Sequence, residues 1–105
     1  MPRIVIVGYR PKPGKAEELD ALMRTHLPIL QQQGLATNRP SYLMKAADGT
    51  VIEVFEWVSE EAIQQAHTNP AVLAMWEQYE ACCEYVPAGH VAEINHLFSA
   101  FAPFE

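Results

Sequence analysis

Two histidines lie on apolar helical stripes, and they are the side chains best suited to proton transfer. His26 falls within the run from Leu19 to Leu30, where apolar residues recur with the 3.6-residue period of a helix. His67 follows Ile63 by four residues in a second helical segment. An imidazole that borders a cavity can act as a general base near pH 7 and take a proton from a phenolic substrate. The pattern predicts His67 as the first catalytic candidate and His26 as the second.

A structural role is the alternative for both histidines. A histidine on an apolar helix face is more often a hydrogen-bonded core residue than a base, and His67 stands close enough to Asn69 to satisfy the end of a helix. Burial of an imidazole without a partner costs about 1–3 kcal/mol, so the protein must either satisfy each ring or use it. The sequence leaves both roles open.

Aromatic residues are the candidates for a substrate-binding wall. Trp76 and Tyr79 share a helix face at a spacing of three residues, and Trp57 closes a strand-like run. Tyr42 and Arg39 flank the second strand-like run, where they would orient a phenolic or anionic group. We predict substrate contacts for Trp76, Tyr79, Trp57 and Tyr42, with burial in the core as the alternative for the large rings.

Motifs for metals and nucleotides are missing from the chain. The histidines and cysteines show no H-x-x-x-H, H-x-E or C-x-x-C spacing, and there is no G-x-G-x-x-G or phosphate-binding loop. The two cysteines, Cys82 and Cys83, are adjacent within a predicted helix and would point to different sides, so we expect reduced thiols. We therefore expect neither a metal nor another cofactor.

Length and charge restrict the classes of protein further. The chain has 105 residues, which fits a single domain over residues 1–105. Its net charge of -6 argues against a nucleic-acid partner, because binding to phosphates requires clustered cations. No signal-like apolar segment follows Met1, and no run approaches the ~18 apolar residues of a membrane span. We expect a cytoplasmic protein without membrane contact.

The elements that position these side chains follow a simple order. Strand signals cover residues 4–9, 41–47 and 50–58, with Asp48-Gly49 as the hairpin turn between the last two. Helical signals cover residues 15–33, 59–67 and 70–86, and a final strand is expected within residues 97–104. The order predicts an α+β, ferredoxin-like βαββαβ unit whose second helix is broken at Asn69-Pro70.

The strands are apolar on both faces, although helices can cover only one face of such a sheet. Residues 4–7 are all β-branched and apolar, and residues 51–58 carry apolar side chains at both odd and even positions. Exposed apolar patches above a few hundred Å² are rare in monomers. We therefore expect a homodimer in which two sheets pack face to face.

Three segments and the Asp48-Gly49 hairpin resemble the antibiotic-biosynthesis-monooxygenase (ABM) family, and the resemblance covers most of the chain. The three segments are PKPG at residues 11–14, EWVSEEA at residues 56–62 and AHTNP at residues 66–70. The resemblance implies a dimeric α+β barrel that takes a small aromatic or apolar ligand. Members include cofactor-free oxygenases of phenolic or quinol-type substrates, haem-degrading enzymes and proteins of unassigned role.

The haem-degrading branch is the one that the residues allow us to test. Its members carry an Asn on the first strand, a Trp in the short second helix and a haem-binding His on the next helix. Those places fall near Val7, at His67 and at Trp76 or Glu77 here, so the resemblance does not carry haem chemistry over. What it implies is a cofactor-independent monooxygenase of an aromatic metabolite. The alternatives are a non-catalytic dimeric ligand-binding or accessory module, and an isomerase or decarboxylase with a histidine base.

Overall fold

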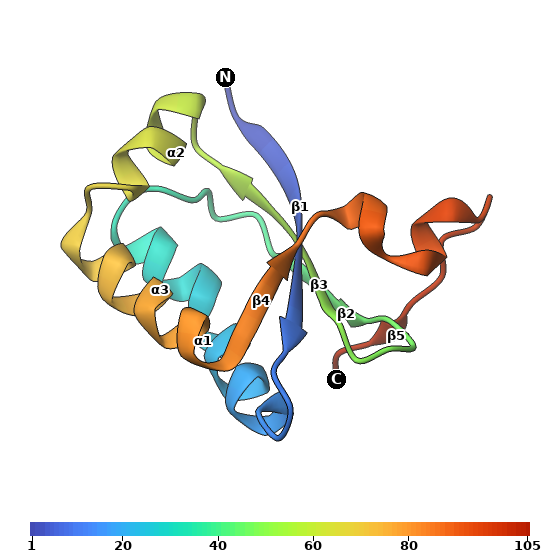
Figure 1. Ribbon diagram of the computed structural model, residues 1–105. Helices are drawn as coiled ribbons and strands as arrows, with labels where there is room; N and C mark the ends of the chain where they lie inside the picture. Colours follow the sequence, from blue (N-terminus) through green and yellow to red (C-terminus); the bar gives the residue numbers. More distant parts are fainter.

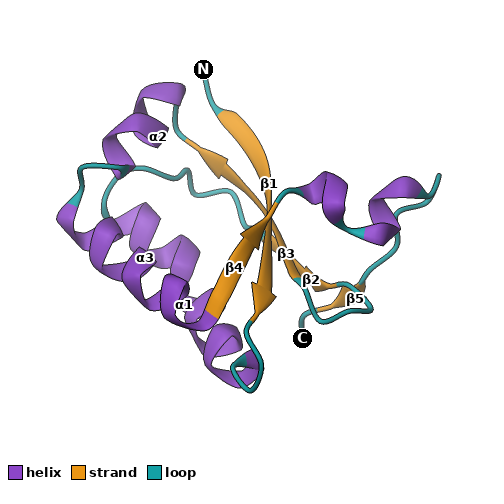
Figure 2. Ribbon diagram, in the orientation of Figure 1, coloured by secondary structure: helices purple, strands orange, loops and turns teal.

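The chain forms one antiparallel sheet with all of its α-helices on one face. A computed structural model describes residues 1–105. The helices are α1 (Ala16–Gln32), α2 (Glu60–Ala66) and α3 (Pro70–Cys82), followed by the short 3-10 turns η1 (Ala88–His90) and η2 (Ala92–Asn95). The strands are β1 (Arg3–Pro11), β2 (Tyr42–Lys45), β3 (Val51–Trp57), β4 (Cys83–Val86) and β5 (Ala102–Pro103). The segment after β4 crosses to the other face (Figures 1 and 2).

The sheet places β1 and β3 at its centre, in the order β4-β1-β3-β2-β5. Val5 lies opposite Phe55, and Tyr9 lies between Val51 on β3 and Tyr85 on β4. Side chains alternate along a strand, so these residues all face the helices. The α+β class is confirmed, and the arrangement is close to a ferredoxin-like domain.

The helix boundaries follow from capping side chains. Ser59 accepts a hydrogen bond from the Ala62 amide at the start of α2, and Asn69 accepts one from the Val72 amide at the start of α3. Pro70 occupies the first turn of α3, where its missing N–H costs nothing. The predicted break at Asn69-Pro70 is therefore confirmed. The longest helix, α1, has 17 residues, and none of the helices combines the length and apolar character that a bilayer crossing requires.

The end of the third helix differs from the expectation. The helix stops at Cys82 rather than near Val86, and Cys83–Val86 forms β4, the strand that pairs with β1. This pairing brings Val86 so close to Gly8 that a Cβ there would lie 2.5 Å from the Val86 carbonyl oxygen. Strand pairing satisfies the backbone of β1 and outweighs the continuing helical pattern. The strand expected within residues 97–104 is reduced to the two-residue β5.

The second face of the sheet is partly covered by the chain's own C-terminal segment. A second, small hydrophobic core lies on this face and consists of Ala46, Ile52, Val86 and Val91. Ile94 and Phe101 are among the residues packed against it. The expectation assigned the whole of this face to a partner subunit. The C-terminal segment covers one end of it, and Ile4 and Ile6 on β1 remain exposed.

The two cysteines are free and buried at the junction of α3 and β4. Cys82 ends the helix and Cys83 begins the strand, so the expected placement of both in a helix is wrong for Cys83. Burial, followed by the neighbouring thiol, raises the pKa of Cys83 to about 12. Such thiols are poor nucleophiles, and they are not candidates for chemistry.

Candidate functional site

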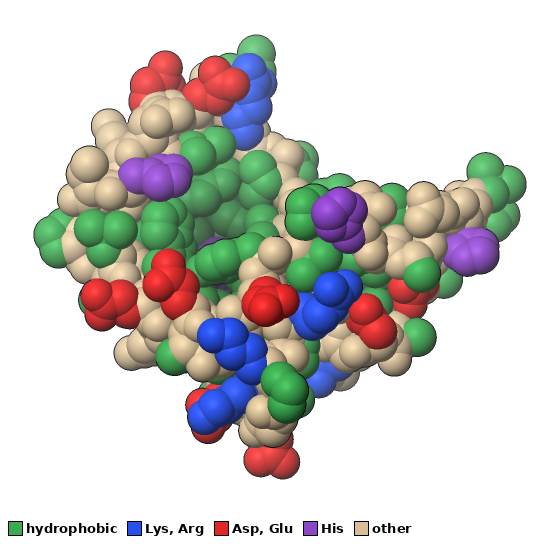
Figure 3. Space-filling view, in the orientation of Figure 1, with side chains coloured by type: hydrophobic (Ala, Val, Ile, Leu, Met, Phe, Trp, Pro, Cys, Tyr) green, Lys and Arg blue, Asp and Glu red, His purple; other side chains and the backbone are tan.

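A cavity of about 360 Å³ opens between the helices and the sheet. Figure 3 shows it as a hollow lined with hydrophobic side chains, with a histidine and acidic groups near its edge. Eight of its 11 lining residues are hydrophobic. The lining residues are Val5, Val7, Tyr9, His26, Phe55, Trp57, Ile63, His67, Trp76, Glu80 and Tyr85. Small-molecule sites are usually apolar clefts of roughly 300–1,000 Å³ with a few placed polar groups, and this cavity fits that description.

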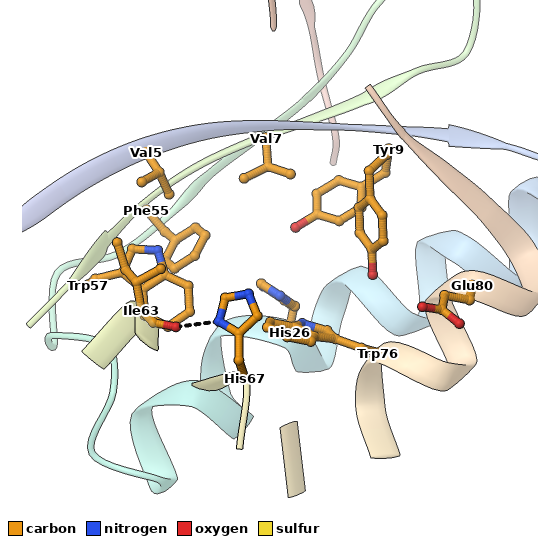
Figure 4. A pocket seen from close by; sticks show the side chains of 11 residues that line it. Val5, Val7, Tyr9, His26, Phe55, Trp57, Ile63, His67, Trp76 and Glu80 are labelled. Atoms are coloured by element: carbon orange, nitrogen blue, oxygen red, sulfur yellow. Dashed lines mark hydrogen bonds between the residues drawn. The ribbon is translucent and has the colours of Figure 1, made fainter. Parts of the chain in front are cut away.

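Opposite walls of the cavity come from different layers of the fold. Val5 and Val7 belong to β1 and point away from the sheet, while His67 and Trp76 rise toward them from the helical side (Figure 4). The period-2 alternation of β1 directs the first pair to the helices. The break between α2 and α3 places the second pair side by side, with ring centroids 5.3 Å apart.

His26 is held by a carboxylate inside the core. Its Nδ1 lies 3.0 Å from Oε2 of Glu53, and the Tyr9 hydroxyl donates to Oε1 of the same carboxylate at 2.8 Å. Glu53 is 0% exposed and His26 is 4% exposed. A buried carboxylate is stable only when its oxygens are paired. With Glu53 as a carboxylate, both of its oxygens accept, and the proton of the neutral His26 ring is then assigned to Nδ1.

The other ring nitrogen of His26 opens onto the cavity. Every fully buried side-chain nitrogen and oxygen in the structure has a hydrogen-bond partner. His26 makes its one hydrogen bond through Nδ1, and it lines the cavity. Nε2 is therefore accessible from the cavity, and in the neutral ring it carries a free lone pair.

His67 presents its ring in the same tautomer by a different contact. Its Nδ1 lies 2.8 Å from the backbone carbonyl of Ile63, the bond drawn in Figure 4. A carbonyl only accepts, so Nδ1 is the donor and Nε2 is the free acceptor. The bond satisfies a carbonyl in the last turn of α2, which is the structural role expected as an alternative. The geometry supports both roles at once.

Two tyrosines add hydroxyl groups to the lining of the cavity. Burial raises the pKa of Tyr9 well above its ordinary value, and the negative charge of Glu53 raises it further. Burial also raises the pKa of Tyr85 to about 12. Both hydroxyls therefore remain neutral at pH 7, and they act as hydrogen-bond donors rather than bases.

The structure brings four of the six predicted site residues to this cavity: His26, His67, Trp57 and Trp76. The other two lie elsewhere. Tyr79 is fully buried, and its hydroxyl donates to the Leu22 carbonyl at 2.9 Å. Tyr42 is 75% exposed and lies with Arg39 in a groove on the opposite face of the sheet.

Sequence reasoning missed Glu53, together with Tyr9, Tyr85 and Glu80. The signal for Glu53 was present, because strand alternation places residue 53 on the same face as Val51 and Phe55. A charged residue at such a position is rarely buried without a specific partner. Tyr85 gave no such signal, because the apolar spacing of residues 70–86 predicted a helix where the structure has β4.

The arrangement suits proton transfer on an apolar ligand. No group of three or more His, Cys, Asp or Glu side chains is placed to bind a metal ion. The lining contains neither lysine nor arginine, so a positive charge can arise there only by protonation of one of the two histidines. A flat, uncharged ligand would contact the aromatic wall and meet two imidazole acceptors.

Comparison with known proteins supports the fold. No family model matches the chain, and no curated protein matches it significantly. Rv0793 from Mycobacterium tuberculosis has a similar structure, with a TM-score of 0.65 over 82% of this chain and 89% of that chain at 20% identity. SO0527 from Shewanella oneidensis is also similar, with a TM-score of 0.59 over 82% and 91% of the two chains at 18% identity. At these identities the likeness shows a shared small α+β fold and nothing about activity.

Proposed function

We propose that the protein is a cofactor-independent monooxygenase of the ABM type that acts on an aromatic, phenolic metabolite in the cavity between helices and sheet. One observation carries the proposal: two histidines, each hydrogen-bonded through Nδ1, border one apolar cavity. The resemblance of residues 11–14, 56–62 and 66–70 to that family supports the same reading.

The chemistry starts with removal of a proton. A phenol whose ring lies against Trp57 and Trp76 would give its proton to a histidine Nε2, and the resulting electron-rich anion reacts with dioxygen. In an anthrone, which is the keto form of such a phenol, one oxygen atom of O₂ converts the ring CH₂ to C=O, and the other oxygen atom leaves as water. The substrate supplies all four electrons, so no external reductant is needed. The protein contributes the base and a cavity that excludes water.

A ligand-binding module without catalysis is the second candidate. The bond from His67 to the Ile63 carbonyl favours it, because that bond alone explains why a histidine stands there. An isomerase or decarboxylase with the same base is a third class, and it differs from the first by not requiring oxygen.

We expect oxygen uptake when the protein is mixed with a panel of hydroquinones and anthrones, because these compounds combine an acidic proton with an oxidisable ring. An oxygen electrode and product mass spectrometry should show one O₂ consumed for each oxidised product. Tyr42→Phe is the matched control, since Tyr42 lies on the other face of the sheet and its loss should leave the rate unchanged. Tight binding without turnover would establish the module instead, and conversion without oxygen would establish the third class.

The same proposal includes a homodimer formed through the open face of the sheet. Ile4 and Ile6 on β1 remain exposed beside Val54 on β3 and Tyr42 on β2. The C-terminal segment covers the neighbouring end of this face and carries two further exposed apolar residues, Leu97 and Phe98. A second copy related by a twofold axis would bury this strip, because the three α-helices of the same chain all lie on the other face of the sheet (Figure 1).

Light scattering after size exclusion should show a dimer at micromolar concentration. Ile6→Glu should convert it to a monomer, because it places a charge at the centre of the strip, where Ile6 is 50% exposed. Leu73→Glu is the matched control, since Leu73 is 42% exposed on the helical side and its replacement should leave the dimer intact. A monomeric wild-type protein would refute the dimer and leave the protomer fold unaffected.

A further inference from the structure

We infer that Glu53 is a positioning residue that makes His26 the proton acceptor of the cavity, so that a neutral phenol entering the site is bound as its phenolate. The inference rests on the proposed function, because it takes the cavity as a site for aromatic ligands. It goes further by assigning a role to Glu53 and by defining the ligand as an uncharged proton donor.

The charge of the cavity lining determines which form of the ligand can enter. The lining has no lysine or arginine, and it carries the carboxylate of Glu80. A carboxylate or phosphate ligand would meet no fixed positive charge and would lose its hydration in an apolar site. A neutral phenol avoids that cost. The positive charge that then stabilises its anion is created within the site, when a histidine takes the proton.

Of the two histidines, His26 is better placed to hold that charge. Its Nδ1 is 3.0 Å from an oxygen of the buried Glu53 carboxyl group, so an acidic side chain lies directly behind the ring. His67 has only a carbonyl dipole at the equivalent nitrogen. The titratable groups around the His26 ring are Glu53, Tyr9 and Tyr79, with the two tyrosine rings at 6.0 and 5.5 Å between centroids. Both tyrosines stay neutral, so Glu53 supplies the charge next to His26.

The proton transfer is simple to balance. The phenol O–H bond breaks, and the proton forms an N–H bond with Nε2 of His26. The Nδ1–H bond stays in place and remains hydrogen-bonded to Glu53. The products are a phenolate and an imidazolium, with Glu53 still ionised and held at its second oxygen by Tyr9. No bond to carbon changes.

Replacement of Glu53 with glutamine tests the positioning role. A carboxylate has two oxygens that accept hydrogen bonds, whereas a glutamine amide has one oxygen that accepts and one nitrogen that donates. If the amide oxygen accepts from Tyr9, the amide nitrogen must donate to His26 Nδ1. The imidazole then moves its proton to Nε2, and the cavity meets a donor in place of an acceptor. The same loss of the correct tautomer explains the low activity of triad enzymes whose aspartate is changed to asparagine.

The experiment uses 4-nitrophenol, whose phenolate is yellow and whose neutral form is not. The protein is titrated into the probe at about pH 6, where most of the free probe is in the colourless neutral form. We expect the yellow band to grow with wild-type protein and to saturate with binding. Both Glu53→Gln and His26→Gln should lower the bound phenolate-to-phenol ratio about tenfold or more, equivalent to at least one pKa unit. Tyr79→Phe is the matched control, since that hydroxyl bonds Leu22 outside the cavity, and it should keep the band.

Binding is measured separately with 4-nitroanisole, which has the same ring and no proton to give. If neither probe binds, the aromatic-ligand function fails. If both bind and no yellow band appears, the site exists and the inference is overturned. Loss of the band in His67→Gln but not in His26→Gln would also overturn it.

Nuclear magnetic resonance keeps the inference testable if the Glu53 variant does not fold. In wild-type protein with ¹⁵N-labelled histidine, the His26 ring should show a protonated Nδ1 and an unprotonated Nε2. The opposite tautomer would show that Glu53 does not direct the ring, whatever the activity of the protein. A shift of Nε2 to the protonated form on addition of 4-nitrophenol would locate the transferred proton directly.

Discussion

Replacing His26 with glutamine should lower kcat for oxidation of a phenolic substrate by about 100-fold to 10,000-fold, the range that general-base catalysis contributes. The glutamine can still donate a hydrogen bond to Glu53, so the buried carboxylate keeps a partner and the fold should persist. What disappears is the lone pair that faces the cavity. The expected signature is a large fall in kcat with a small change in KM.

Steady-state kinetics combined with thermal melting separates this outcome from a structural one. His67→Gln provides the comparison. The sequence ranks His67 as the first catalytic candidate, but in the structure it is His26 that is hydrogen-bonded to a carboxyl group. We expect the smaller loss for His67→Gln, since its ring lacks a charged partner. A larger loss for His67→Gln at unchanged melting temperature would reverse the assignment. A fall in activity matched by a fall in stability would mark His26 as a structural residue.

Much of the fold was predictable because its signals are local. The caps at Ser59 and Asn69 depend on side chains that bond to the next turn, and the Asp48-Gly49 turn depends on a glycine at φ +92°. β4 was not predictable in this way. Residues 83–86 continue the apolar spacing of α3, and only the pairing with β1 makes them a strand. Non-local pairing leaves little trace in one sequence.

The candidate site was predictable in part for the same reason. Helical periodicity placed His26 and His67 on inward faces. His26 is buried as expected, whereas His67 is the exposed C-cap residue of α2, and both line one cavity. Periodicity could not separate Trp76, which lines the cavity, from Tyr79, which is buried beside it. The hydrogen bond between Glu53 and His26 joins β3 to α1. It depends on the register of the sheet, which one sequence does not reveal.

Replacing Glu53 with methionine should destabilise the protein by about 3–5 kcal/mol, the usual cost of removing one partner from a buried charged pair. Methionine fills most of the volume, but the His26 Nδ1–H and the Tyr9 hydroxyl both lose their acceptor inside the core. For a domain of this size the melting temperature should fall by more than about 10 °C. Differential scanning calorimetry measures both quantities. Thr50→Val, at a neighbouring buried position, is the control for a change of polarity without loss of the carboxylate.

The combined variant Tyr9→Phe, His26→Leu, Glu53→Met distinguishes a functional cluster from a structural one. Replacing an entire buried charged group with well-packed apolar residues is often neutral or stabilising by about 1–4 kcal/mol. We therefore expect the triple variant to recover the stability lost in Glu53→Met and to be at least as stable as wild type, while it fails to ionise 4-nitrophenol. Such a result would mean that the Tyr9–Glu53–His26 cluster is kept at the expense of stability, which only a role in the cavity explains. A triple variant less stable than Glu53→Met would show instead that the cluster holds the core together, and His26 would then be a structural residue.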